Sequence, residues 1–303
     1  MKLCQFFLPG KGKRTGVIDG SQVIDVTSRK AKISSVLDLI VRGRSCKGIE
    51  RLARQLTRKS RVCFAWSELN RTPSPRKAHL LGPLDPPEVW GAGITYKRSM
   101  HYYSEHASHS DRPKGVYDCV YESDRPEIFF KATASRTVGP NASIGIRQDS
   151  NLTAVEAELA IIIGFNGQIV GYTAGNDCSA WDIERENPLF LAQSKIFDSC
   201  FALGPVLVTS EEIADPHRLA LSCTIWRGGN QLYKGHVNTR EMKRSCQELV
   251  DWLCRSNVTP AGTVLSTGTG IPIPDEYALK DGDVVEIDIE GVGTLKNRVR
   301  KLP

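Results

Sequence analysis

Three acidic residues in the middle of the chain have the types and the spacing of a metal site. Glu156 and Glu158 alternate with apolar residues, so we expect both of them on one face of a β-strand. The pair Asn166-Gly167 predicts a two-residue type I′ turn that folds this strand into a hairpin. Pairing about that turn places Asp177 opposite Glu156, unless a bulge shifts the register. The hairpin is therefore predicted to gather three carboxylates on one face.

Such a cluster would repel itself, and carboxylates are costly to bury without compensation. A divalent cation would remove both costs. Three carboxylate oxygens without a neighbouring Cys or His pair favour Mg²⁺, Mn²⁺ or Ca²⁺ over zinc. The alternative is a hairpin with one solvated face, on which the acids are ordinary surface charges. The apolar run Ile161-Ile162-Ile163 indicates burial on both faces and so disfavours that alternative.

Three other segments carry residues with possible chemistry. Lys131 ends the apolar strand expected at 126–132, where its ammonium either extends to solvent or meets a bound anion. The segment STGTG at 266–270 lacks the ending of a phosphate-binding loop, which favours a plain turn between strands. His106 and His109 have the spacing of a metal pair, but no acid or cysteine stands at a ligand spacing beside them.

Length and composition indicate a globular enzyme with a substantial core. The chain has 303 residues, of which 40% are hydrophobic and 24% charged, and it has no apolar run long enough to span a membrane. Its nine cysteines are scattered without a C-x-x-C pair, which predicts free thiols and a cytoplasmic location. The net charge of +6 is concentrated near the N-terminus without a nucleic-acid motif. We therefore expect neither a nucleic acid nor a membrane as partner.

The elements that must position these residues are mostly strands. Residues 1–75 are predicted to form a small N-terminal α+β domain, and a proline-rich stretch separates it from a catalytic domain at 76–303. Strands without a regular βαβ rhythm predict an α+β, predominantly β fold with largely antiparallel sheets. Residues 239–255 have the best helical pattern, with Thr239 as the expected N-cap. Residues 97–124 have little pattern and are expected to form a lid or binding loop.

Several motifs together resemble the fumarylacetoacetate hydrolase superfamily over about residues 80–303. They are EAELA at 156–160, NDCSA at 176–180, SKIFDSC at 194–200 followed by Gly-Pro, and TGT at 267–269. The resemblance implies the mixed β-roll of that family's C-terminal domain. It also implies Mg²⁺ or Mn²⁺ held by Glu156, Glu158 and Asp177, and a homodimer or homotetramer.

Other segments are similar to the 2-keto-3-deoxy-D-arabinonate dehydratase branch of this superfamily: GITYKRS at 93–99, DRPEIFFKAT at 124–133, and the run from DIERENPLFLAQSKI to LKDGDVVEI. The hydrolases carry a His and Glu pair in the lid, and alignment on Tyr96 places Ser99 at that His. Trp181 stands where the superfamily has the arginine of S-A-R-D. Glu184 stands where fumarylacetoacetate hydrolases have a glutamine.

The resemblance implies dehydration of a small 2-keto acid, 2-keto-3-deoxy-D-arabinonate or -xylonate, to 2,5-dioxopentanoate through a metal-stabilised enolate. Lys195 would be either the general base or a fixed counter-charge to the carboxylates. Glu184 would assist the leaving hydroxide. Lys131, Thr269 and Tyr96 would bind the substrate.

Two alternatives from other functional classes remain open. One is a C–C hydrolase or decarboxylase of acylpyruvates or dioxo acids, in which His101 or His106 takes the role of the lid histidine. The other is a non-catalytic sensor of sugar acids. The presence of Glu156, Glu158, Asp177 and Lys195 disfavours the sensor.

Overall fold

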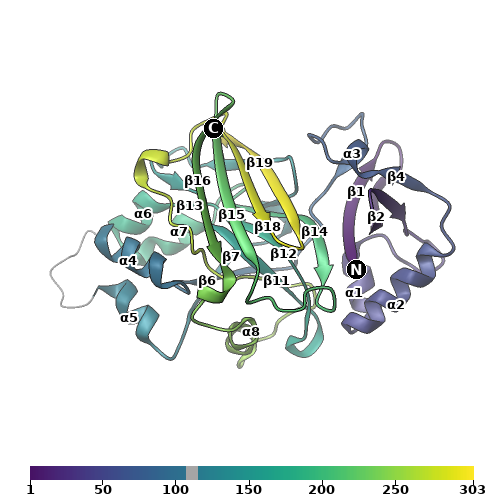
Figure 1. The fold of residues 1–303 in the computed structure, drawn as a ribbon, viewed down its shortest axis with the longest axis horizontal. Coiled ribbons are helices and arrows are strands. Elements are labelled where there is room, and N and C mark those ends of the chain that lie inside the picture. The colour runs from purple at the N-terminus through teal and green to yellow at the C-terminus, as the bar shows by residue number, and fades with distance from the viewer. Residues whose placement is uncertain (107–114) are drawn as a thin grey trace.

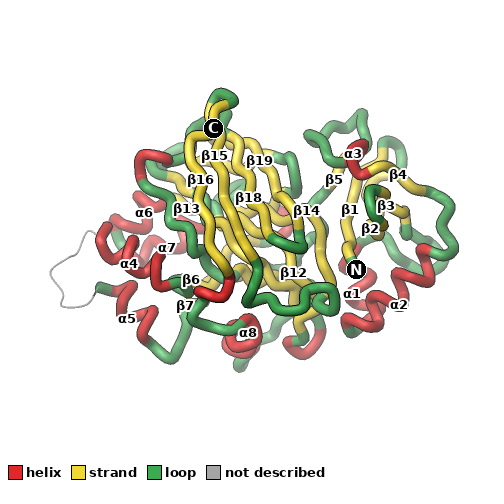
Figure 2. The backbone as a smooth tube through the Cα atoms, in the orientation of Figure 1, coloured by secondary structure: helices red, strands yellow, loops and turns green. Residues whose placement is uncertain are grey.

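β-strands dominate the structure, a computed structural model that describes residues 1–106 and 115–303. In this part of the chain, one large sheet runs through the molecule in the order β4-β3-β2-β1-β14-β12-β11-β17-β6-β7. A second sheet has the order β16-β15-β18-β19-β9. Helices α4 to α7 gather at one end, and the N-terminal unit lies at the other (Figures 1 and 2). The expected α+β, predominantly β fold is confirmed.

The first 80 residues form five β-strands, which extend the large sheet, and three helices. The elements are β1 (Lys2–Leu8), β2 (Gly12–Asp19), β3 (Gln22–Asp25), α1 (Val36–Gly43), α2 (Cys46–Thr57), β4 (Cys63–Ala65), α3 (Trp66–Leu69) and β5 (His79–Leu80). The side chains of Ser35 and Ser45 cap α1 and α2 by accepting hydrogen bonds from backbone N–H groups of the first turn.

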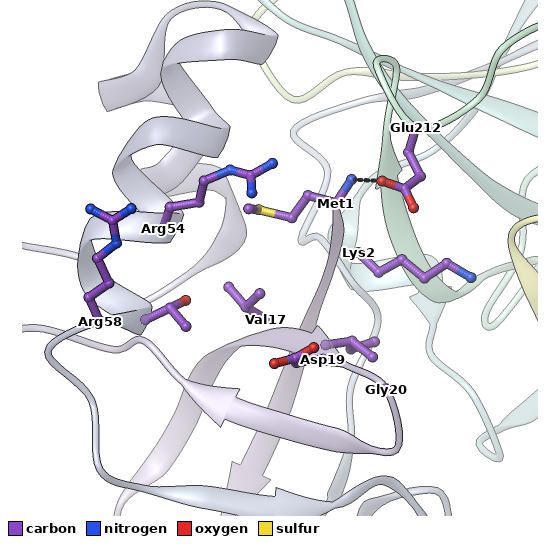
Figure 3. A pocket seen from close by; sticks show the side chains of 10 residues that line it. Met1, Lys2, Val17, Asp19, Gly20, Arg54, Arg58 and Glu212 are labelled. Carbon is purple, nitrogen blue, oxygen red and sulfur yellow. Dashed lines mark hydrogen bonds and ion pairs between the residues drawn. The ribbon is translucent and has the colours of Figure 1, made fainter.

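The N-terminal unit is joined to the rest of the fold by backbone pairing, because β1 lies antiparallel to β14 (Phe201–Thr209). A hollow lies at this junction, between α2 and the β1–β2 hairpin (Figure 3). Arg54 and Arg58 border it from α2, and the Met1 amino group bonds Glu212 on its other side. None of the candidate site residues lines this hollow.

The remaining elements build the two sheets and the helices around the candidate site. The strands are β6 (Val89–Gly93), β7 (Glu127–Ala132), β8 (Thr137–Val138), β9 (Ser143–Ile146), β10 (Thr153–Ala154), β11 (Ala157–Ile163), β12 (Ile169–Asp177), β13 (Ser179–Ala180), β15 (Ala220–Arg227), β16 (Asn230–Asn238), β17 (Val264–Ser266), β18 (Val284–Ile289) and β19 (Gly293–Lys301). The helices are α4 (Lys97–His106), α5 (Val116–Glu122), α6 (Trp181–Glu186), α7 (Leu191–Lys195) and α8 (Cys246–Cys254), with short 3-10 turns such as η4 (Thr239–Glu241) and η5 (Asp275–Tyr277).

The two sheets pack through β12 and β14 of the large sheet against β18 and β19 of the second. Fully buried aliphatic residues on these strands include Leu203, Ile287 and Leu295. The strands of the central hairpin, β11 and β12, are buried on both faces. None of the helices among the described residues is both long and apolar enough to cross a lipid bilayer.

The central hairpin has the predicted turn and register. Asn166 and Gly167 both have positive φ, 54° and 72°, as a type I′ turn requires. Ala157 pairs with Asn176, and the Asp177 N–H donates to the Glu156 carbonyl. The register shifts once, close to the turn, between Ile162 and Ile163. The body of the hairpin keeps the predicted pairing because this irregularity lies at the far end from the acids.

One expectation about a helix was wrong. The helix expected at 239–255 begins only at Cys246, where Ser245 is its N-cap. Thr239 instead accepts a hydrogen bond from the Leu219 N–H and begins the 3-10 turn η4, and Met242 then forms a β-bridge with Tyr96. The stretch 97–124 was expected to form a lid or binding loop, and within its described residues it contains α4 and α5.

Candidate active site

The hairpin brings the three predicted metal ligands together. One carboxylate oxygen from each of Glu156, Glu158 and Asp177 lies within 4.8 Å of the others. The residues are only 6%, 2% and 1% exposed, so the solvated-face alternative is wrong. Glu156 immediately precedes β11, Glu158 lies in it, and Asp177 ends β12.

Glu158 is held by the glycine-rich segment that follows β17. Since β17 pairs with β11, the chain after it passes directly beside this carboxylate. The Ser266 hydroxyl and the Gly268 N–H both donate to Glu158 Oε2, the latter over 2.8 Å. Burial, reinforced by the charge of Asp177, raises the pKa of Glu158 well above its usual range. At this end of the cluster, negative charge is therefore incompletely balanced by positive charge.

Lys195 connects the other two carboxylates. Its Nζ lies 2.8 Å from Glu156 Oε2 and 3.4 Å from Asp177 Oδ2, and it donates to Ser179 Oγ over 2.7 Å. Burial alone would lower the pKa of this lysine, but Asp177 and Glu156 hold it well above the usual value. In this arrangement Lys195 is a protonated counter-charge to the cluster.

Lys131 is fully buried, so the alternative in which its ammonium extends to solvent was wrong. Its Nζ lies 2.6 Å from Asp177 Oδ1 and donates to the Cys178 carbonyl over 2.7 Å. Although burial opposes ionisation of Asp177, Lys131 and Lys195 together hold the pKa of that carboxyl below its usual range.

A small cavity lies beside the cluster. The described residues that line it are Ala92, Gly93, Ile94, Ser99, Tyr103, Glu127, Phe129, Glu156, Glu184, Leu191, Lys195, Gly268 and Thr269. Glu184 accepts hydrogen bonds from the Tyr117 hydroxyl at 3.3 Å and the Ser194 hydroxyl at 3.4 Å. Tyr96 is buried but is not among the lining residues.

Glu127 is a lining residue that sequence reasoning missed. It stands opposite Gly93 in the β6–β7 pair, and a Cβ at Gly93 would lie 2.0 Å from Glu127 Oε2. The absence of that Cβ lets the Glu127 side chain lie across β6. Burial and then the charge of Glu184 raise the pKa of Glu127 to about 7. The available signal was the spacing, since Glu127 is four residues before Lys131 in the strand expected at 126–132 and regular alternation predicts one face for both.

The histidines proposed for the lid do not reach this cavity. His101 and His106 of α4 are exposed, and His106 stacks on Tyr102 with ring centroids 4.2 Å apart. His109 lies outside the described residues. Helix α4 instead contributes Ser99 and Tyr103 to the cavity.

The residues present fit a hard divalent cation. Three buried carboxyl groups face only two ammonium groups, Lys131 and Lys195, so ionisation of all three would leave a net negative charge that a bound cation would neutralise. Its donor atoms are all oxygens, which suits Mg²⁺ or Mn²⁺. The Trp181 indole also donates to Glu156 over 2.7 Å and fixes its orientation.

Similarity to known proteins agrees with this geometry. The chain is 48% identical over 219 residues to 2-dehydro-3-deoxy-D-arabinonate dehydratase of Saccharolobus solfataricus. This alignment covers 72% of this chain and 74% of the relative. It is 42% identical to a probable 2-keto-3-deoxyxylonate dehydratase of Haloferax volcanii, over 97% of this chain and 98% of the relative.

A solved structure of 2-keto-3-deoxy-D-arabinonate dehydratase complexed with magnesium and 2,5-dioxopentanoate superposes with a TM-score of 0.82. That protein is 36% identical, and the match covers 100% of this chain and 99% of the other. Residues 99–300 match the fumarylacetoacetate (FAA) hydrolase C-terminal family. The chain therefore belongs to the fumarylacetoacetate hydrolase family.

Proposed function

We propose that this protein is a Mg²⁺- or Mn²⁺-dependent dehydratase that converts 2-keto-3-deoxy-D-arabinonate or -xylonate to 2,5-dioxopentanoate. The observation that carries the proposal is the buried cluster of Glu156, Glu158 and Asp177 beside a cavity that contains two further carboxyl groups, Glu127 and Glu184. The similarity to two dehydratases that act on 2-keto-3-deoxy sugar acids supports the same reaction.

The three clustered carboxylates would hold the cation, which when bound supplies a Lewis acid for the keto and carboxylate oxygens of a 2-keto acid. Lys131 and Lys195 keep the ligand carboxylates oriented and partly neutralised. Thr269 lines the cavity and remains the candidate to bind a polar group of the substrate. Lys131 supports the site through Asp177, because it does not line the cavity itself.

The chemistry needs a base for the C3 proton and a proton for the C4 hydroxyl. We assign the first role to Glu127, because a carboxyl with a pKa of about 7 is matched to proton transfer near neutral pH. Glu184 is the candidate that passes the proton taken from C3 to the hydroxyl group, which leaves as water. The C3–H and C4–O bonds break, a C3–C4 double bond forms, and tautomerisation with transfer of a C5 proton gives the aldehyde product. Lys195 acts as a counter-charge.

A C–C hydrolase or decarboxylase is the second candidate function. It would need a group that activates water, such as a histidine paired with a carboxylate. Among the described residues that line the cavity there is no histidine. This observation favours elimination over hydrolysis.

The location and assembly of the protein are part of the proposal. All nine cysteines are free, which supports a reducing, cytoplasmic compartment. We further propose a homodimer or homotetramer, by resemblance to the family.

The deciding experiment is an assay of purified protein with Mg²⁺ or Mn²⁺ and 2-keto-3-deoxy-D-arabinonate, coupled to detection of 2,5-dioxopentanoate. We expect product that disappears with chelator and returns when the metal is restored. Absence of product, together with cleavage of acetylpyruvate or oxaloacetate, would transfer the assignment to the hydrolase or decarboxylase. Metal-dependent turnover of any 2-keto acid would exclude the sensor.

A further inference from the structure

The cavity beside the metal cluster has an excess of negative charge. Of its described lining residues, Glu127, Glu156 and Glu184 are acidic and only Lys195 is basic. Lys195 is already bonded to Glu156 and to Asp177. No basic side chain among the described lining residues is therefore left to receive a second anionic group of a substrate.

Two of these acids lie outside the metal cluster. Glu127 comes from β7 and Glu184 from α6, and neither belongs to the group of carboxylates that could share an ion. Among the described residues, the hydrogen-bond donors to Glu184 are neutral hydroxyls, those of Tyr117 and Ser194. Both acids nevertheless line the same small cavity.

We propose that Glu127 and Glu184 make the site selective for 2-keto acids with one carboxylate and an uncharged, hydroxyl-bearing distal end, and that they exclude 2-keto diacids. The proposal rests on the proposed function, in which the metal takes the keto acid end of the substrate. The distal end must then lie near the remaining acids. Hydroxyl groups can donate to these carboxylates, whereas a second carboxylate would be repelled by them.

The overall charge of the protein opposes this selectivity, so a preference for the monoanion cannot result from long-range attraction. The chain has a net charge of +6, so long-range attraction favours a dianion over a monoanion. Any preference for the monoanion must therefore come from charges next to the bound ligand. Inside a partly desolvated cavity, a like charge a few ångströms away is worth at least about tenfold in affinity.

The test compares two ligands of five carbons, 2-oxopentanoate and 2-oxoglutarate, which differ by a carboxylate at the distal end. Their dissociation constants are measured by titration calorimetry on the Mg²⁺-loaded protein. We expect 2-oxopentanoate to bind at least about tenfold more tightly. In the Glu184→Gln variant we expect this ratio to fall by about tenfold.

The matched control is Glu186→Gln, which removes the same charge from the same helix at an exposed position outside the cavity. It should leave the ratio unchanged. Equal affinity of the wild-type protein for the two ligands overturns the proposal, and so does an equal effect of both variants. If the Glu184 variant does not fold, the wild-type ratio decides alone. If neither ligand binds to the Mg²⁺-loaded protein, the result contradicts the proposed function itself, and the selectivity that rests on it is refuted as well.

Discussion

Replacing Lys131 by methionine tests whether this lysine holds the carboxylate cluster together. Lys131 Nζ lies 2.6 Å from Asp177 Oδ1, and the two side chains are 0% and 1% exposed. Removing one partner of such a pair leaves an unpaired buried charge and costs about 3–5 kcal/mol. Asp177 keeps its contact with Lys195 at 3.4 Å, so we expect a loss of about 3 kcal/mol, near the lower limit.

The bound metal should reverse part of this loss. Removing one ammonium makes the cluster more negative, so the variant should bind Mg²⁺ more tightly than the wild-type protein does. A cation at a hundred times its dissociation constant stabilises the folded state by about 2.7 kcal/mol. The difference in stability between the two proteins should therefore be largest in chelator and smaller in saturating Mg²⁺.

The assay is urea denaturation of both proteins at neutral pH, with chelator and with Mg²⁺. Neutral pH is suitable because the pKa of Asp177 is lower in the folded protein than in the unfolded chain. The stabilising contribution of this carboxylate is therefore fully present above the unfolded pKa of about 3.9, and it is lost as the pH falls below that value. The control is Lys234→Met, at an exposed position on β16. A loss below about 1 kcal/mol in chelator, or a loss that Mg²⁺ leaves unchanged, would refute the reasoning.

Three further outcomes are expected. Glu156→Gln should abolish activity and weaken Mg²⁺ binding in calorimetry while circular dichroism stays unchanged; full activity would contradict the metal assignment. Glu127→Gln should lower kcat by about 10²–10⁴-fold, because it removes the general base. In the wild-type protein, kcat should decline as the pH falls below about 7, where Glu127 becomes protonated. A Glu127→Gln variant that keeps the wild-type kcat would exclude this base. Asp275 accepts hydrogen bonds from Tyr102 of α4 at 2.9 Å and from Arg185 of α6 at 2.6 and 2.9 Å. Asp275→Asn should therefore loosen α4 and raise KM more than it lowers kcat in steady-state assays, and an unchanged KM would argue against this role.

The carboxylate cluster could be predicted from sequence because its geometry is local. Side-chain alternation along a strand and an Asn-Gly turn are short-range rules, and together they place Glu156, Glu158 and Asp177 on one face. The single register shift, between Ile162 and Ile163, did not disturb the predicted pairing near the acids. The family resemblance added the identity of the reaction, which the spacing of three acids does not contain.

Helix boundaries near residue 240 could not be predicted in the same way. Thr239 and Ser245 are both acceptable N-caps by residue type. The choice between them depends on partners far away in sequence, since Thr239 bonds Leu219 and Met242 bridges to Tyr96. Local propensity does not include those contacts.

By itself, the sequence determined the fold class, the central hairpin and its three carboxylates. Only the tertiary structure decided what surrounds them. The order β12-β11-β17-β6-β7 brings Glu127 into the cavity and buries Lys131 against Asp177, although these residues are far from the hairpin turn in sequence. The physical reason is that burial and electrostatic partners arise from long-range strand pairing, and the alternation of residues along one strand does not specify which strand lies beside it.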